Sequence, residues 1–258
     1  QKYKMKKIII YGGKKLHGSI SISGSKNSSL AILASSMLFE KKVVLKNIPI
    51  VEDIKTMIKL LIYLGKNIKV KKTIEITNSK KFGKSFIAPY ELVKTMRAGI
   101  LVLGPLISKF KKAKVSLPGG CAIGARPIDL HLKFLKSIGV RNYIDKGYVI
   151  SKLNNIKKKN IYRFKKISVG ATINSILASC LIPNKIILNN IATEPEIIDL
   201  IKFLKKAGIK IKFLSNRKIE ILGKKYLNQI SYEIMPDRIE AGTYMIASAI
   251  TNISPHSI

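Results

Sequence analysis

Residues 53–65 read DIKTMIKLLIYLG, and this stretch decides the fold because its pattern occurs three times in the chain. The second copy, residues 127–139, reads PIDLHLKFLKSIG, and the third copy, residues 196–208, reads EIIDLIKFLKKAG. In each copy, apolar residues recur at the spacing of one helix face. Each copy also ends on a glycine, the residue that best tolerates the left-handed conformation after a helix. The chain is therefore expected to contain three related units.

The residues after each glycine change to the pattern of a strand. Apolar residues alternate with polar ones over residues 68–76 of the first unit and 209–221 of the third, which predicts a hairpin of two strands. An apolar helix and a short strand are also expected before the repeated helix. In the first unit these are residues 30–37 and 43–45, and in the third they are residues 173–181 and 186–188.

The expected order in each unit is therefore helix, strand, helix, strand, strand, which defines an α/β (α+β) fold. Such a unit cannot bury its own helices. Three units arranged about a common axis would bury their helices in the centre and leave their sheets outside.

Composition narrows the class of protein. The chain has 258 residues, of which 47% are hydrophobic, enough for a sizeable core. Its longest apolar stretch, residues 98–108, is interrupted by Gly104 and Pro105 and is shorter than the ~20 residues that span a bilayer. The apolar run after the first lysines is shorter than the core of a secretory signal. The two cysteines lie in different sequence environments, which argues against a metal site, and we expect a cytoplasmic protein in which both stay reduced.

The formal net charge of +34 raises the possibility of nucleic-acid binding. The lysines, however, are scattered as pairs, from Lys14-Lys15 near one end to Lys205-Lys206 near the other. Tryptophan is absent and only 7% of residues are aromatic, so few side chains could stack on bases. We favour a solvated basic surface that attracts anionic substrates, with a basic nucleic-acid-binding protein as the less favoured alternative.

Residues 117–130 read LPGGCAIGARPIDL and form the segment with the clearest chemistry. Glycines on both sides of Cys121 let the backbone approach a ligand closely. Arg126 follows five residues later, and a thiol near a guanidinium has surroundings that favour cysteine chemistry. Taken by itself, the segment could equally be a glycine turn that carries an incidental cysteine.

Five other segments accompany this loop. They are SGSKN at residues 23–27, KTMRAG at 94–99, SVGAT at 168–172, EPEI at 194–197 and MPDRIEAGT at 235–243. In this order, the six segments resemble the UDP-N-acetylglucosamine 1-carboxyvinyltransferases, the enolpyruvyl transferase family of bacterial peptidoglycan synthesis. The resemblance runs from about Lys14 to Thr251. It implies an inside-out α/β barrel of three helix-strand-helix-strand-strand units, and an enzyme with two such domains.

The resemblance also implies where the domains divide. Residues 26–235 would form a complete barrel domain, and residues 1–25 and 236–258 would be an incomplete portion of the second domain. A helix is expected over residues 240–250, with an apolar face left uncovered. The family extends well beyond residue 258, so we expect a C-terminally truncated chain, whose missing part could be a separate C-terminal fragment.

The implied reaction transfers the enolpyruvyl group of phosphoenolpyruvate to the 3-hydroxyl of UDP-N-acetylglucosamine and releases phosphate. The resemblance implies no cofactor and no metal, and it implies small-molecule substrates, no membrane and no specific nucleic acid. Cys121 matches the family's general acid, which is the thiol that the antibiotic fosfomycin alkylates. A thiol with its ordinary pKa of ~8.5 is protonated at neutral pH and can donate a proton. We interpret Cys180, in an apolar helix, as a small buried hydrophobic residue.

The resemblance assigns the binding residues as well. Lys26 and Asn27 match the pair that binds phosphoenolpyruvate, although Asn27 could also cap the helix that follows. Arg97 and Arg126 match guanidinium groups that line the cleft. The positions that match the nucleotide-sugar site are Pro127, Ile128, Asp129, Leu130, Lys166, Ser168 and Val169.

Several other polar residues have structural explanations. Asp129 could simply decorate the start of a helix, and we interpret His131 as a packing or helix-surface residue. Glu194 and Glu196 are typical of a helix start. The stretch from Asp237 to Glu240 could line the cleft or hold the crossing between the domains.

The resemblance places the base that acts on the sugar hydroxyl, and further arginines, beyond residue 258. The chain would therefore carry the acid and half of the binding groups. A non-catalytic truncated remnant is the alternative to an active enzyme. The shikimate-pathway enolpyruvyl transferase is disfavoured because it lacks the Gly-Gly-Cys loop.

Overall fold

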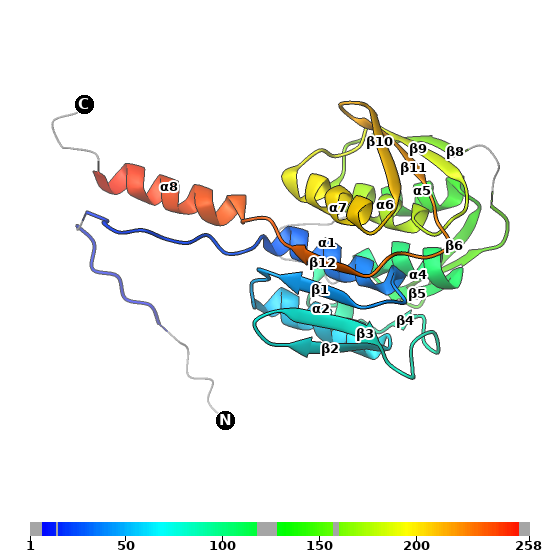
Figure 1. Ribbon diagram of the computed structural model, residues 1–258, viewed down its shortest axis with the longest axis horizontal. Coiled ribbons are helices and arrows are strands. Elements are labelled where there is room, and N and C mark those ends of the chain that lie inside the picture. The colour runs from blue at the N-terminus through cyan, green and yellow to red at the C-terminus, as the bar shows by residue number, and fades with distance from the viewer. Residues whose placement is uncertain (1–6, 14, 118–127, 157–159, 253–258) are drawn as a thin grey trace.

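The computed structural model describes residues 7–13, 15–117, 128–156 and 160–252 (Figure 1). The first unit has the expected order of elements. It comprises α1 (Lys26–Ser35) with the short helix η1 (Ser36–Leu38), β1 (Val43–Lys46), α2 (Glu52–Tyr63), β2 (Lys66–Val70) and β3 (Ile74–Asn78).

The second and third units repeat this order after an additional strand at their start, and the second unit also has two additional short helices. The second comprises β4 (Ile87–Ala88), α3 (Tyr90–Val93), η2 (Arg97–Val102), α4 (Leu103–Phe110), β5 (Lys112–Ser116), α5 (Asp129–Ser137), β6 (Val140–Asp145) and β7 (Tyr148–Leu153). The third comprises β8 (Asn160–Arg163), α6 (Val169–Ser179), β9 (Lys185–Asn189), α7 (Pro195–Lys206), β10 (Lys210–Ser215) and β11 (Lys218–Leu222). After them come β12 (Ile230–Glu233) and α8 (Arg238–Asn252).

The glycines that end the repeated helices have the predicted conformation. Gly65, Gly139 and Gly208 have φ angles of 99°, 102° and 98°. Residues that carry a side chain rarely adopt these backbone angles, so glycine lets the chain pass directly from each helix into its hairpin.

Each unit contains one four-stranded sheet, with the predicted hairpin at one edge. The strand orders are β12-β1-β3-β2, β4-β5-β7-β6 and β10-β11-β9-β8. At the other edge of each sheet, the outer strand β12, β4 or β8 pairs in parallel with its neighbour β1, β5 or β9. The sequence did not predict these three strands, which have at most four residues each. Because β12 follows the third unit and pairs with β1, the chain after the third unit returns to the sheet of the first unit.

The helices lie inside and the sheets outside, as predicted (Figure 1). Every residue of α1 from Ser28 to Ser35 and of α6 from Ala171 to Ser179 is buried. Apart from Asn174 in α6, these residues are apolar or small on all sides, which suits a helix enclosed by others. In contrast, α2, α5 and α7 bury only part of their surface. Among the described residues the three sheets stay separate from one another and do not join into a closed barrel.

The helix expected over residues 240–250 is present as α8. It projects from the body of the molecule together with the N-terminal segment (Figure 1). Large apolar side chains on both are exposed, among them Ile10 and Met245, which are 83% and 72% exposed. This apolar surface has no cover in the part of the chain that the structure describes. Within that part, no helix is long and apolar enough to cross a membrane.

Candidate functional site

A cavity of about 600 Å³ lies where the inner helices begin. It brings together residues from all three units, which are far apart in the sequence. Six of the predicted binding residues line it, namely Lys26, Asn27, Arg97, Ile128, Ser168 and Val169.

The positions of these residues follow from the fold. Lys26 begins α1, Arg97 begins η2 and Val169 begins α6. The first N–H groups of a helix have no partner within the helix, and the helix dipole makes this end positive. Because α1 and α6 both start at the cavity, their N-termini and the side chains of Lys26 and Arg97 favour an anionic ligand there, while the carboxylates of Asp53 and Glu196 on the same lining offset part of this charge.

Ser25, and not Asn27, caps the first helix. The Ser25 side chain accepts a hydrogen bond from the backbone N–H of Ser28 at 3.3 Å. The alternative that Asn27 caps α1 is therefore wrong. Asn27 is the second residue of the helix, and it lines the cavity with no capping role.

Asp53 is a residue of the cavity that sequence reasoning missed. Its carboxylate pairs with the Lys26 ammonium at 3.0 Å, and both side chains are partly exposed. Asp53 lies in the first turn of α2, inside the repeat that defines the fold. The repeat is recognised by its apolar positions, and Asp53 is not one of them. The sequence therefore held no separate signal that Asp53 faces Lys26.

Ser168 caps the third inner helix by accepting the backbone N–H of Ala171 at 3.3 Å. Gly170 follows in the first turn, and a Cβ atom there would lie 3.4 Å from the ring of His131. The small residue lets the start of α6 pack directly against α5.

His131 is buried as a packing residue, as interpreted from the sequence, and it also lines the cavity. The side-chain amide of Asn174 donates to its Nδ1 at 2.8 Å, which assigns the ring proton to Nε2. Burial, and to a lesser degree the nearby Arg97 charge, lower the pKa of His131 to about 4. The imidazole is therefore neutral at physiological pH and adds no charge to the cavity.

Asn174 connects three elements beneath the cavity. Its Oδ1 accepts the backbone N–H of Gly104 at 2.7 Å, and its Nδ2 donates to the carbonyl of Ile100 at 3.0 Å as well as to His131. Sequence reasoning missed this residue. The available signal was a carboxamide in the middle of an otherwise apolar helix, where a buried polar group needs partners.

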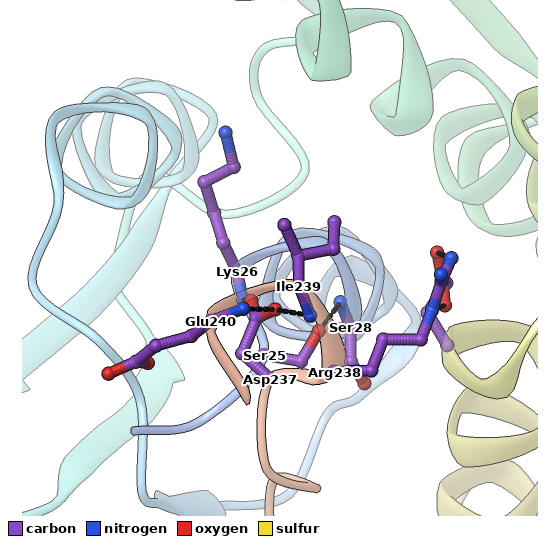
Figure 2. A network of polar contacts seen from close by, with 8 residues as sticks. Ser25, Lys26, Ser28, Asp237, Arg238, Ile239 and Glu240 are labelled. Atoms are coloured by element: carbon purple, nitrogen blue, oxygen red, sulfur yellow. Dashed lines mark hydrogen bonds and ion pairs between the residues drawn. The ribbon is translucent and has the colours of Figure 1, made fainter. Parts of the chain in front are cut away.

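Glu194 and Glu196 occupy the start of α7, as predicted. Glu196 is buried beside the cavity and forms a paired interaction with Arg238 of α8, with N–O distances of 3.2 Å and 3.1 Å. This hydrogen-bonded ion pair raises the pKa of Arg238. Arg238 and Asp237 thereby attach this segment to α7 and α1, which agrees with a role in holding the crossing in place, and none of the residues from Asp237 to Glu240 lines the cavity (Figure 2).

The other predicted site residues either do not line the cavity or lie outside the described residues. Asp129 begins α5 and pairs with Lys133 at 2.7 Å, Leu130 packs against the core, and Lys166 is exposed. None of these three lines the cavity. Cys121, Arg126 and Pro127 lie outside the described residues. Cys180 is a fully buried thiol at the end of α6, as predicted, and burial raises its pKa strongly.

Comparisons with known proteins agree with one another. The family model of EPSP synthase (3-phosphoshikimate 1-carboxyvinyltransferase) matches residues 10–254. A UDP-N-acetylglucosamine 1-carboxyvinyltransferase of Pelagibacter ubique is 54% identical over 248 residues, covering 96% of this chain and 59% of the relative. Proteins of the same name from Saccharophagus degradans and Rickettsia prowazekii are 46% and 48% identical, with the same coverage of 96% and 59%. The chain thus spans about three fifths of the length of these relatives.

Solved structures share the fold. The enolpyruvyl transferase NikO from Streptomyces tendae matches with a TM-score of 0.78 at 18% identity, over 92% of this chain and 56% of that chain. EPSP synthase from Acinetobacter baumannii matches with a TM-score of 0.71 at 17% identity, over 91% of this chain and 53% of that chain.

Proposed function

Because the chain belongs to the EPSP synthase (3-phosphoshikimate 1-carboxyvinyltransferase) family, we propose that it serves enolpyruvyl transfer from phosphoenolpyruvate to the 3-hydroxyl of UDP-N-acetylglucosamine. The product phosphate is released, and the reaction is the first committed step of peptidoglycan synthesis. The choice of acceptor rests on the relatives that are 46–54% identical, all of which are named for UDP-N-acetylglucosamine. The observation that carries the proposal is the cavity at which Lys26, Arg97 and the starts of α1 and α6 converge.

The groups in the cavity suit two anionic substrates. Lys26 offers a point charge to a phosphate, Asn27 offers an amide to a carboxylate, and the planar guanidinium of Arg97 suits either anion. Ser168 and Val169, at the start of α6, would bind the diphosphate of the nucleotide-sugar through helix N–H groups. Neutral His131 adds no charge to these groups.

Asp53 sets a condition on this site. Its ion pair with Lys26 is partly exposed, so water screens it and breaking it costs little. An incoming phosphate can therefore compete with the carboxylate of Asp53 for Lys26.

We assign Cys121 as the general acid of the addition step. Its proton goes to the methylene carbon of phosphoenolpyruvate while the oxygen of the sugar hydroxyl adds to the neighbouring carbon and gives up its proton to a base. The resulting ketal then expels phosphate as the new methyl group returns a proton to the Cys121 thiolate, which re-forms the carbon–carbon double bond. Ile128, at the end of the segment that carries Cys121 and Arg126, lines the cavity. Arg126 is only two residues away from Ile128 in the chain, which supports a place for its guanidinium at the same site.

The remaining length of the relatives would supply the other wall of the site. Residues 26–235 would form the complete barrel domain, and residues 1–25 with 236–258 would belong to a second domain. The uncovered apolar surface of α8 and the N-terminal segment supports this division, because exposed apolar area is unfavourable by about 25 cal/mol per Å². The base that removes the proton of the sugar hydroxyl would lie in that second domain. Cytoplasmic location and the absence of a specific nucleic-acid partner remain predictions.

Fosfomycin labelling tests the proposal. With UDP-N-acetylglucosamine present, fosfomycin is expected to alkylate Cys121, and mass spectrometry of a digest identifies the labelled peptide. Cys180 should stay unlabelled because it is buried and its pKa is raised, so that little reactive thiolate forms. A Cys121→Ser variant should lose the label completely.

Two outcomes would count against the proposal. Preferential labelling of Cys180 would contradict the assignment of Cys121. Absence of any label at saturating UDP-N-acetylglucosamine would favour the non-catalytic remnant. Replacement of the nucleotide-sugar by 3-phosphoshikimate serves as the control for acceptor choice, and it should not promote labelling.

A further inference from the structure

The chain passes twice between the body and the projecting part of the molecule, and the two passages are paired. Gly24 and Pro236 form an antiparallel bridge. Beside it, the N–H of Ser25 donates to the carbonyl of Met235, and the N–H of Asp237 donates to the carbonyl of Ser23, both at 2.8 Å. The N-terminal segment and α8 therefore leave the body side by side (Figure 1).

One carboxylate at this crossing binds the starts of two helices. Oδ1 of Asp237 accepts the N–H groups of Ile239 and Glu240, at 2.8 Å and 3.2 Å, and so caps α8. Oδ2 of Asp237 accepts the N–H of Lys26, the first residue of α1, at 3.0 Å. Figure 2 shows Asp237 between the two helix starts. Each oxygen thus serves a different helix.

The charged form of Asp237 is the one that suits this arrangement. Its partial burial alone would raise its pKa, but the N–H groups of Lys26, Ile239 and Glu240 lower the pKa below its ordinary value. A carboxylate that accepts backbone N–H groups is stabilised in its ionised form. Asp237 is therefore ionised at neutral pH and can serve both helices at once.

Two further contacts tie the first turn of α8 to the body. Glu240 accepts hydrogen bonds from the backbone and the hydroxyl of Ser23 in the N-terminal segment. Arg238 pairs with Glu196, which is buried beside the cavity. The first turn of α8 is thus attached to α1, to α7 and to the N-terminal segment.

From this geometry we infer that Asp237 is a positioning residue for the cavity. With one carboxylate it fixes the direction in which α8 leaves the body relative to the start of α1, where Lys26 and Asn27 line the cavity. Whatever α8 carries is thereby held in a set orientation to the anion-binding groups. The purpose of this coupling rests on the proposed function, whereas the coupling itself is a property of the chain alone.

Asparagine at position 237 separates the two caps. Asparagine is as good a helix cap as aspartate, but it has only one acceptor oxygen. Asp237→Asn should keep the cap on α8, which belongs to its own chain segment, and lose the bond to Lys26. Asp237→Ala should lose both. Backbone amide exchange of the full chain, followed by NMR, reports each N–H separately.

The expected result is a split between the two helices. In Asp237→Ala, exchange should accelerate about fivefold, the factor for the ~1 kcal/mol of a helix cap, at Lys26, Ile239 and Glu240. In Asp237→Asn, only Lys26 should accelerate. The control is Asp145→Ala, which removes the same charge from an exposed side chain. It should leave the exchange rates of all three amides unchanged. Thermal unfolding of the core should change little, because Ser25 still caps α1 and α8 lies outside the three sheets (Figure 1).

Unchanged exchange of the Lys26 amide in Asp237→Ala would overturn the inference, as would wild-type protection of all three amides in Asp237→Asn. If Asp237→Ala does not fold, Asp237→Asn alone decides between these outcomes. The measurement uses no substrate, so its failure would leave the proposed function standing. Conversely, failure of fosfomycin labelling would leave the coupling of α1 and α8 standing.

Discussion

An Asn174→Leu variant is expected to unfold about 4 kcal/mol more easily than the unchanged chain. Leucine is similar in size but cannot hydrogen-bond, so the N–H of Gly104, the carbonyl of Ile100 and Nδ1 of His131 would lose their partner. Asn174 is 2% exposed, so water cannot replace it. Each buried polar group left without a partner costs about 1–3 kcal/mol, part of which the added apolar contact offsets. The variant should also loosen His131 and the floor of the cavity.

Urea denaturation measures the difference, and the exposed Asn67 gives the matched control. Asn67 lies on β2 and its side chain faces solvent, so Asn67→Leu should change stability by no more than about 0.5 kcal/mol. A loss below about 1 kcal/mol for Asn174→Leu would mean that the three hydrogen bonds do not hold the inner helices together. If Asn174→Leu lost the expected stability but His131 kept its position, Asn174 would hold the inner helices together without positioning the residues of the cavity.

A Gly24→Ala variant is expected to separate the two paired segments at Gly24 and Pro236. Its free energy of unfolding should fall by about 3 kcal/mol or more. A Cβ atom on Gly24 would lie 1.6 Å from the carbonyl oxygen of Asn47 and 2.8 Å from its carbonyl carbon. Both are backbone atoms. Asn47 has a φ of 55°, and its side-chain amide donates a hydrogen bond to the carbonyl of Ile234 at 3.1 Å, which holds it in place. No rotation of a side chain can relieve this clash, so the paired segments must move apart.

Gly242→Ala is the matched control for this variant. It makes the same chemical change in α8, where nothing lies within 4 Å of the added atom. Alanine favours a helix over glycine by about 1 kcal/mol, so this control should be neutral or slightly stabilising. Limited proteolysis should release α8 faster from the Gly24→Ala variant than from the control. Equal cleavage and equal stability of the two variants would contradict the close contact at Gly24.

The sequence predicted the elements whose signals are local. The apolar period and the terminal glycine located α2, α5 and α7, and the alternation after each glycine located the hairpins. The fourth strand of each sheet escaped prediction. β4 has only two residues, and β12 belongs to the first sheet although it follows the third unit. Such strands are specified by their partners, and a single strand of this length carries almost no pattern of its own.

The candidate site divides in the same way. Lys26, Arg97 and Ser168 were predicted because they lie in the motifs that carry the family resemblance. The fold brings these three residues to one cavity. Asp53 and Asn174 were missed because their roles depend on neighbours more than twenty residues away in the chain, such as Lys26 and Gly104. Lys166 and Asp129 were selected by position in a motif, and neither of them lines the cavity.

Titration of the full chain with UDP-N-acetylglucosamine followed by phosphoenolpyruvate, observed at backbone amides by NMR, tests the central claim most directly. We expect saturable shifts at Asn27, Ser168 and Val169, which persist at moderate salt, and we expect Lys26→Ala to weaken phosphoenolpyruvate binding about tenfold, as for one charge-assisted contact. Shifts spread over the exposed lysines outside the cavity, and abolished by salt, would instead identify nonspecific attraction to the +34 charge and contradict the account.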